Sequence, residues 1–341
     1  MTQTSDARLD ALTHWLGGPA AQYGLDVSTM TSASADASFR RYFRVQGAEA
    51  SFIVMDAPAP QEDIRPFLKV CALMREAGLN VPEIYASDAD KGFILMSDLG
   101  RQTYLEALTE DNAAQLMNAA TDSLVLWQKA SRPGVLPAYD HAVLSREIHL
   151  FPEWYVGRHR GYTMTEQQSR IVEATFEKIL ANNLAQPCVF VHRDFMPRNL
   201  MVPLDDKGRP GVLDFQDALY GPVAYDIASL MRDAFLSWGE SFVLDITIRY
   251  WEKARRAGIP VPADFGLFWR DVEWMGIQRH LKVLGIFARI NYRDGKPKYL
   301  ADTPRFVHYV RETANRYDEL KPINWLLDQF EDSKVVEQFT F

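Results

Sequence analysis

The feature that most constrains this chain is a pair of polar loops set between short apolar strands. The apolar run at residues 188–191 leads into the polar segment 192–199 (HRDFMPRN), and a second apolar run follows at 200–202. Fifteen residues after Asn199 comes Asp214, which ends another short apolar run. Functional side chains concentrate on loops that a rigid framework positions, so we expect the acids and the amide of these loops to form one site.

Asp194, Asn199 and Asp214 carry the oxygen groups that phosphoryl transfer needs. A carboxylate aligns the attacking hydroxyl and accepts its proton, and we assign this role to Asp194. Magnesium prefers oxygen ligands, so we expect Asn199 and Asp214 to hold it against the phosphates. The spacing from His192 through Asp194 to Asn199 has the form of a kinase catalytic loop, with Asp214 as the metal-binding aspartate. The alternative, a surface loop with one histidine and two acids, is disfavoured by the strands on either side.

Periodicity and turn residues divide the chain into a mixed part and a helical part. The first part is predicted to contain helices at 7–16 and 61–77 and strands within 29–45 and at 51–55, 83–87 and 92–97. The second is predicted to contain helices at 109–129, 140–158, 165–184, 223–238, 241–257, 265–290 and 303–317. We therefore expect an α+β protein with a small N-terminal mixed β-sheet lobe (1–97), a hinge (98–101) and a large, mainly helical C-terminal lobe (102–341).

Charge and cysteine content narrow the class of protein and its partners. The net charge of −8 disfavours nonspecific binding to nucleic acid. Two cysteines, Cys71 and Cys188, do not make a disulfide framework, and they fit a reducing compartment. The N-terminus lacks the pattern of a secretory signal, and no apolar run is long enough to span a membrane. We expect a cytoplasmic protein with no nucleic acid, membrane or obligate protein partner.

These motifs resemble the aminoglycoside phosphotransferase family, whose members share a two-lobed protein-kinase-like fold. The resemblance covers about residues 32–311, and it includes a hinge-like segment at 93–100 (FILMSDLG). Three further segments resemble the bacterial N-acetylmuramate/N-acetylglucosamine anomeric kinases of peptidoglycan recycling, namely 39–44 (FRRYFR), 150–155 (LFPEWY) and 278–285 (QRHLKVLG). The resemblance implies an ATP- and Mg²⁺-dependent sugar 1-kinase that phosphorylates the C1 hydroxyl of these amino sugars.

The phosphate-binding part of the expected nucleotide site departs from the kinase pattern. Met55 stands on the third strand where kinases carry a lysine that binds the α- and β-phosphates. Arg41 and Arg44 are our candidates for that role, and solvated strand residues are the alternative. The turn at 34–38 lacks glycine, so backbone N–H groups and the hydroxyls of Ser34 and Ser38 would contact phosphate; a plain hairpin turn is the alternative.

The remaining site predictions concern adenine, the acceptor and the support of the catalytic loop. Adenine is expected at the hinge residues Met96, Ser97 and Asp98. Sugar contacts are expected from Arg198, Glu147, Trp154 and Arg279, where a cation suits the lactyl carboxylate of muramic acid. Large aromatics on helices more often belong to the core, which is the alternative for Trp154. His192, Asp217 and Asp226 are expected to support the site; the alternatives are a solvated loop acid for Asp217 and a helix first-turn acid for Asp226.

Two alternative functions follow from the same residues. One is a kinase of another small acceptor, such as an aminoglycoside, a choline-like amine or an amino-acid alcohol. The other is an inactive kinase-fold binding module, which only Met55 supports. Pro222 follows Asp214 by eight residues, which leaves no room for the activation segment of a protein kinase. The sequence therefore favours a small-molecule kinase.

Overall fold

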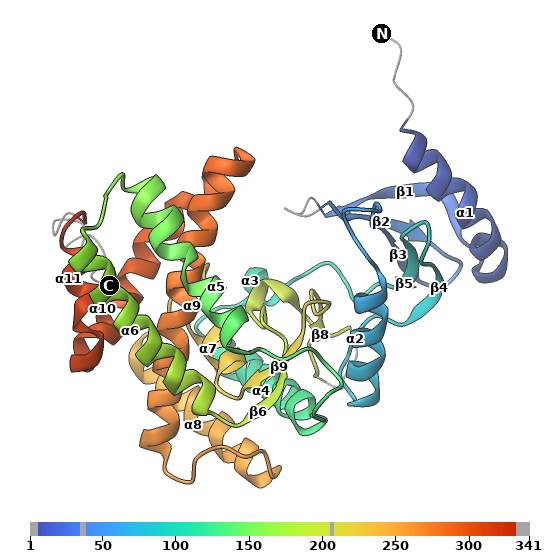
Figure 1. Cartoon of the computed structure of the whole chain (residues 1–341). Helices are drawn as coiled ribbons and strands as arrows, with labels where there is room; N and C mark the ends of the chain where they lie inside the picture. Colours follow the sequence, from blue (N-terminus) through green and yellow to red (C-terminus); the bar gives the residue numbers. More distant parts are fainter. Residues whose placement is uncertain (1–5, 35–38, 205–207, 332–341) are drawn as a thin grey trace. The chain divides into compact units, whose positions relative to one another are not determined.

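The protein consists of two compact units, which we describe separately (Figure 1). The structure, a computed structural model, describes residues 6–34, 39–204 and 208–331. One unit comprises Met1–Ala107 and Arg198–Asp217, and the other comprises Leu108–Pro197 and Ala218–Phe341. The first is built on a β-sheet and the second is mainly helical, so the predicted α+β class is confirmed. The lobe boundaries 1–97, 98–101 and 102–341 stay a prediction.

The first unit is built on a five-stranded antiparallel sheet with the order β1-β2-β3-β5-β4. Its strands are β1 (Asp26–Ser34), β2 (Arg41–Gln46), β3 (Ser51–Asp56), β4 (Ile84–Asp88) and β5 (Phe93–Ser97). Helix α1 (Ala7–Tyr23) packs Leu12 and Leu16 against Val45, Val54 and Phe93. Side chains alternate between the faces of a strand, so residues 43, 45, 52 and 54 lie on the face that α1 covers.

Residues 198–204 and 208–217 pack into this first unit together with α2 (Arg65–Glu76) and α3 (Tyr104–Ala107). They include a short 3₁₀ turn, η2 (Pro197–Asn199), and the two-stranded pair β7 (Leu200–Met201) and β8 (Gly211–Val212). The Val212 N–H donates to the Asn80 carbonyl at 2.8 Å. Phe215 packs on Phe67 of α2, with ring centroids 4.8 Å apart. The segment that carries Asn199 and Asp214 is thereby fixed to the N-terminal unit.

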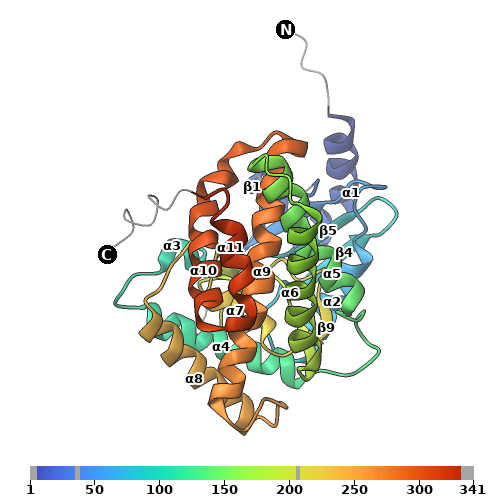
Figure 2. The same ribbon diagram turned by 60° about the vertical axis from the view of Figure 1, so that its left-hand side comes forward.

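The second unit is a helical assembly around the long helix α9 (Phe265–Asp294), and it also holds the strand pair β6 (Cys188–Val191) and β9 (Leu219–Pro222). Its other elements are α4 (Ala113–Lys129), α5 (His141–Ile148), a π-helix η1 (Phe151–His159), α6 (Glu166–Ala185), α7 (Tyr225–Met231), α8 (Glu240–Arg256), η3 (Pro297–Asp302), α10 (Thr303–Arg316), η4 (Asp318–Leu320) and α11 (Lys321–Leu327). Figure 2 shows α6, α9, α10 and α11 side by side. Gly285 of α9 lies so close to Leu150 that a Cβ would lie 2.3 Å from the Leu150 carbonyl carbon.

Two predicted helices differ from the structure for local reasons. The predicted helix 140–158 is divided into α5 and η1, because Pro152 has no N–H to continue the α-helical ladder. The predicted helix 223–238 ends at Met231, and Arg232 leaves helical geometry with φ −124° and ψ 64°. The Asp233 carboxylate accepts the Ala234 N–H at 2.6 Å, a local bond that competes with helix continuation.

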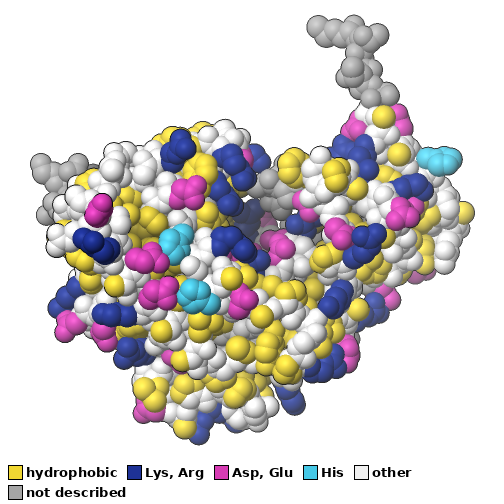
Figure 3. Space-filling view, viewed as in Figure 1, with side chains coloured by type: hydrophobic (Ala, Val, Ile, Leu, Met, Phe, Trp, Pro, Cys, Tyr) yellow, Lys and Arg dark blue, Asp and Glu magenta, His cyan; other side chains and the backbone are white. Residues whose placement is uncertain are grey.

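Within the described parts of the chain, no helix combines the length and the apolar character needed to cross a bilayer. On the face shown in Figure 3, basic and acidic side chains are interspersed.

Candidate active site

The backbone of the loop that carries Asp194 is held by hydrogen bonds to the buried carboxylate of Asp226 on α7. One Asp226 oxygen accepts the His192 N–H at 2.7 Å and the other accepts the Arg193 N–H at 3.0 Å. Burial raises the pKa of Asp226 to about 7, although these two N–H groups favour its charged form. Asp194 is half-buried, and its N–H donates to His192 Nδ1 at 3.3 Å. His192 and Asp226, both predicted to support the site, are therefore joined by a hydrogen bond at this loop.

Arg193 has a left-handed backbone conformation, with φ +80°, which costs a non-glycine residue on the order of 1 kcal/mol. Its guanidinium pairs with the buried carboxylate of Glu147, which also accepts hydrogen bonds from the Tyr139 hydroxyl and Lys282. Burial alone would raise the pKa of Glu147, but the charges of Lys282 and Arg193 lower it below its ordinary value. Glu147, predicted as a sugar contact, thus binds the side chain next to Asp194.

Asn199 and Asp214 form the second cluster, which lies wholly in the first unit. Asn199 Nδ2 donates to Asp214 Oδ2 at 3.4 Å, and Gln216 Nε2 donates to Asp214 Oδ1 at 2.9 Å. The Leu213 N–H donates to the Asn199 carbonyl at 2.9 Å, which ties the two loops together. Asp214 has φ +61°; within the described residues it shares a positive φ with Arg193 alone among non-glycine residues. Strained backbone of this kind is concentrated at functional sites.

The donor set at this cluster fits magnesium. A carboxylate and an amide supply the hard oxygen atoms that Mg²⁺ prefers, and Mg²⁺ commonly takes its other ligands from phosphate and water. Within the described residues, no group of three His, Cys, Asp or Glu side chains is placed to bind a metal. A metal here would therefore rely on Asn199 and Asp214 together with a phosphate-bearing substrate.

The predicted adenine-binding residues lie at the end of β5. Met96 is buried and pairs with Ile53 and Ile84 in the sheet. Ser97 Oγ accepts the Glu83 N–H at 2.9 Å. The Asp98 carboxylate accepts hydrogen bonds from Arg44 at 3.0 Å and from the Ser51 hydroxyl at 2.7 Å. Burial alone would raise the pKa of Asp98, but these partners lower it.

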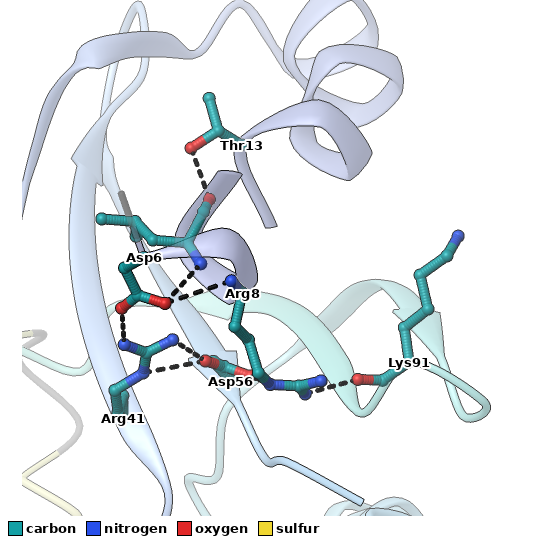
Figure 4. A network of polar contacts seen from close by, with 7 residues as sticks. Asp6, Arg8, Thr13, Arg41, Asp56 and Lys91 are labelled. Carbon is teal, nitrogen blue, oxygen red and sulfur yellow. Dashed lines mark hydrogen bonds and ion pairs between the residues drawn. The ribbon is translucent and has the colours of Figure 1, made fainter. Parts of the chain in front are cut away.

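The predicted phosphate-binding residues differ in their contacts in the structure. Arg41 binds Asp56 at 2.6 Å on the face of the sheet covered by α1, and it also pairs with Asp6 (Figure 4). Arg44 binds Asp98 and donates to the Gly100 carbonyl at 2.9 Å. Ser34 ends β1, whereas Ser38 lies outside the described residues.

The remaining acceptor-side predictions are spread over both units. Arg198 is half-buried beside Asn199, and Asp217 is exposed in the same unit. Trp154 of η1 packs against the core of the second unit, with the Arg158 guanidinium 5.8 Å from its ring. Arg279 of α9 is only 3% exposed, and its Nη1 has no hydrogen-bond partner among the described residues.

Sequence reasoning missed four residues that the structure places at these loops: Arg40, Arg193, Gln216 and Lys282. Arg40 forms an ion pair with Glu62 at 3.3 Å, and its pKa responds to the charges of Asp214 and Asp217. Its signal was alternation along the strand, because residues 40, 42 and 44 share one face. Arg193 and Lys282, the partners of Glu147, lie far from it in the sequence, so no local pattern indicates the contact.

Comparison with known proteins decides the class of this chain. Residues 29–259 match the phosphotransferase enzyme family. The chain belongs to the phosphotransferase enzyme family. A Pseudomonas aeruginosa protein named N-acetylmuramate/N-acetylglucosamine kinase is 50% identical over 331 residues, which cover 95% of this chain and 97% of the relative. The predicted phosphotransferase is thereby confirmed.

Solved structures of a choline kinase and an aminoglycoside phosphotransferase share the fold of this phosphotransferase. A choline kinase from Streptococcus pneumoniae has a TM-score of 0.62 at 13% identity, covering 90% of this chain and 99% of its own. An ADP-bound aminoglycoside phosphotransferase has a TM-score of 0.58 at 16% identity, covering 88% and 97%. The predicted kinase-like fold is confirmed.

Proposed function

We propose that this phosphotransferase transfers the terminal phosphate of ATP to the C1 hydroxyl of N-acetylmuramate and N-acetylglucosamine. The observation that carries the proposal is the 50% identity to a kinase named for these two sugars, along almost the whole chain. The intact loops around Asp194 and Asp214 support an active enzyme over an inactive binding module. The product is a sugar 1-phosphate, which suits cell-wall recycling in the cytoplasm, where ATP is available.

Asp194 is the group that acts on the acceptor in this proposal. Its carboxylate aligns the C1 hydroxyl and accepts its proton as the oxygen attacks the terminal phosphorus. Asp226 and Glu147 act through the loop: the first fixes the backbone N–H groups of residues 192 and 193, and the second fixes the Arg193 side chain. A loop held in this way keeps Asp194 at the geometry that the transfer requires.

Asn199 and Asp214 would hold Mg²⁺. The metal, when bound, neutralises charge that develops on the phosphate oxygens. Gln216 and the strained backbone at Asp214 keep the carboxylate in one orientation. Met96, Ser97 and Asp98 remain the proposed adenine-binding positions; the Ser97 N–H already donates to the Glu83 carbonyl at 2.9 Å, so adenine would contact other backbone groups of this segment.

Arg279 is the residue we assign to the lactyl carboxylate of N-acetylmuramate. The residue is only 3% exposed, and its Nη1 makes no hydrogen bond among the described residues, although its charge also acts on the buried carboxylate of Asp233. Its charge acts on Asp226, so it lies near the element that holds the catalytic loop. N-acetylglucosamine lacks the lactyl group and does not use this contact.

The test is ADP release by the purified protein with Mg²⁺ and ATP against a panel of acceptors. The panel holds N-acetylmuramate, N-acetylglucosamine, glucose, galactosamine, kanamycin, choline and homoserine. We expect turnover on the two N-acetyl sugars and a loss of about 10²-fold or more in Asp194→Asn. Asp90→Asn is the matched control, because that side chain is 97% exposed. Turnover confined to another acceptor would contradict the sugar assignment, and full activity of Asp194→Asn would contradict the mechanism.

A further inference from the structure

On the third strand of this phosphotransferase, an apolar residue occupies the position that usually binds phosphate in kinases. Met55 on β3 is fully buried, whereas other kinases carry at this strand a lysine that contacts the α- and β-phosphates. Its neighbour Asp56 is also fully buried, and it is neutralised by Arg8 at 2.7 Å and Arg41 at 2.6 Å. Neither residue of this strand end offers a positive charge to a phosphate.

Side-chain alternation separates the three arginines of residues 40–44. Arg41 lies on the face of the sheet that α1 covers, together with Phe43 and Val45. Tyr42 pairs with Met55 across β2 and β3, so these two side chains share the opposite face. Arg40 directly precedes β2, and alternation continued by one residue places it on the face of Tyr42 and Met55.

Arg40 forms an ion pair with Glu62 and belongs to the same unit as Asp214, the carboxylate assigned to the metal in the proposed function. Glu62 binds it at 3.3 Å, and only 13% of the Arg40 side chain and 19% of the Glu62 side chain are exposed. Burial alone would lower the pKa of Arg40, but Tyr42, Glu62, Asp214 and Asp217 together raise it. The guanidinium therefore lies within electrostatic reach of the Asp214 carboxylate.

Arg44 shares the face of Tyr42 but is fixed at the other end of its strand. Its guanidinium binds Asp98, and Ser51 donates to the same carboxylate. Its remaining contact is the Gly100 carbonyl at 2.9 Å, so its charge is held at the end of β5. Arg41 and Arg44 are thus held by other carboxylates, and Arg40 is the arginine on this face whose pKa responds to the charge of Asp214.

We propose that Arg40, positioned by Glu62, binds the α- and β-phosphates of ATP and takes the role that the third-strand lysine has in other kinases. The inference rests on the proposed ATP-dependent function. A guanidinium supplies parallel N–H donors that match phosphate oxygens, which a methionine thioether does not. Glu62 restrains the side chain, as the helix glutamate restrains the lysine of protein kinases.

The test measures nucleotide binding without the sugar, by titration calorimetry with ATP and with adenosine. We expect Arg40→Met to weaken ATP binding by about 10- to 100-fold, the range for lost hydrogen bonds to a charged group, and to leave adenosine binding unchanged. Arg40→Lys keeps the charge and should recover part of the loss. Glu62→Gln should weaken ATP binding less than Arg40→Met. Arg65→Met is the matched control, because the Arg65 side chain is 68% exposed. This variant should bind ATP and adenosine as the wild type does.

Four outcomes would overturn the inference. Equal loss of ATP and adenosine binding in Arg40→Met would mean that the residue shapes the pocket rather than binding phosphate. A phosphate-selective loss in Arg41→Met or Arg44→Met, with none in Arg40→Met, would assign the role elsewhere. Wild-type protein that binds no ATP would overturn the proposed function together with this inference, whereas wild-type binding with no effect of Arg40→Met would overturn the inference alone.

Discussion

Replacing Asp226 by asparagine tests whether the hydrogen bonds to its carboxylate hold the catalytic loop in place. Both Asp226 oxygens accept backbone N–H groups, from His192 at 2.7 Å and Arg193 at 3.0 Å. Asparagine offers one acceptor oxygen and turns an N–H₂ group toward the other donor. A buried donor left without a partner costs about 1–3 kcal/mol in the free energy of unfolding. We expect that loss in urea denaturation at pH 8.

Titration of Asp226 in the wild type sets how the stability difference between wild type and variant changes with pH. The pKa of Asp226 is raised from 3.8 to about 7 in the folded protein, so the folded state binds the extra proton between these values. Asp226 therefore stabilises wild type more below about pH 4 than above about pH 7, and the contribution is lost as pH rises through about 7. Its slope is at most about 1.4 kcal/mol per pH unit.

The assay compares urea unfolding of wild type and Asp226→Asn from pH 5 to pH 8, with the exposed Asp90→Asn as control. We expect the difference in unfolding free energy between wild type and Asp226→Asn to shrink as pH rises, while the control difference stays near zero. Turnover should fall by about 10-fold or more, since small misplacements of a catalytic group cost up to about 10²-fold. A pH-independent stability difference, or unchanged turnover, would refute the reasoning.

Two further predictions concern the buried charges of the second unit. Arg279→Met should lower kcat/KM for N-acetylmuramate about 10-fold or more relative to N-acetylglucosamine, because only the first sugar carries a carboxylate; parallel losses on both sugars in steady-state assays would argue against a carboxylate contact. Glu147→Gln should lower the free energy of unfolding by about 3–5 kcal/mol, because it leaves the buried charges of Arg193 and Lys282 without a carboxylate. Urea midpoints measure this loss, with the half-exposed Glu177→Gln as control; equal midpoints for the two variants would contradict it.

The positions of the main elements could be predicted from local pattern alone. Strands β3 and β5 follow from short β-branched and aromatic runs between turn residues, and α8 and α10 follow from helical periodicity. Helix breaks were harder to predict, because they depend on single residues. Pro152 reorganises a predicted continuous helix into α5 and η1, and the local bond of Asp233 competes with continuation of α7.

Some residues of the candidate site could likewise be predicted from local sequence, and others could not. Asp194, Asn199 and Asp214 could be selected from spacing because one continuous segment carries all three. Glu147, predicted as a sugar contact, meets Arg193 of the loop after β6 and Lys282 of α9 through tertiary packing, which spacing does not record. The pairing of Arg40 with Glu62 likewise joins a residue before β2 to one before α2, across a stretch with no shared motif.

We propose that this phosphotransferase places phosphate on C1 of an N-acetyl amino sugar through Asp194. Phosphorus NMR of the product from N-acetylmuramate, ATP and Mg²⁺ tests it most directly, because coupling to the anomeric proton locates the phosphate. We predict a sugar 1-phosphate with wild-type protein and with Asp90→Asn, and none with Asp194→Asn under matched conditions. Phosphate on another oxygen, or the same product at the same rate from Asp194→Asn, would contradict the account.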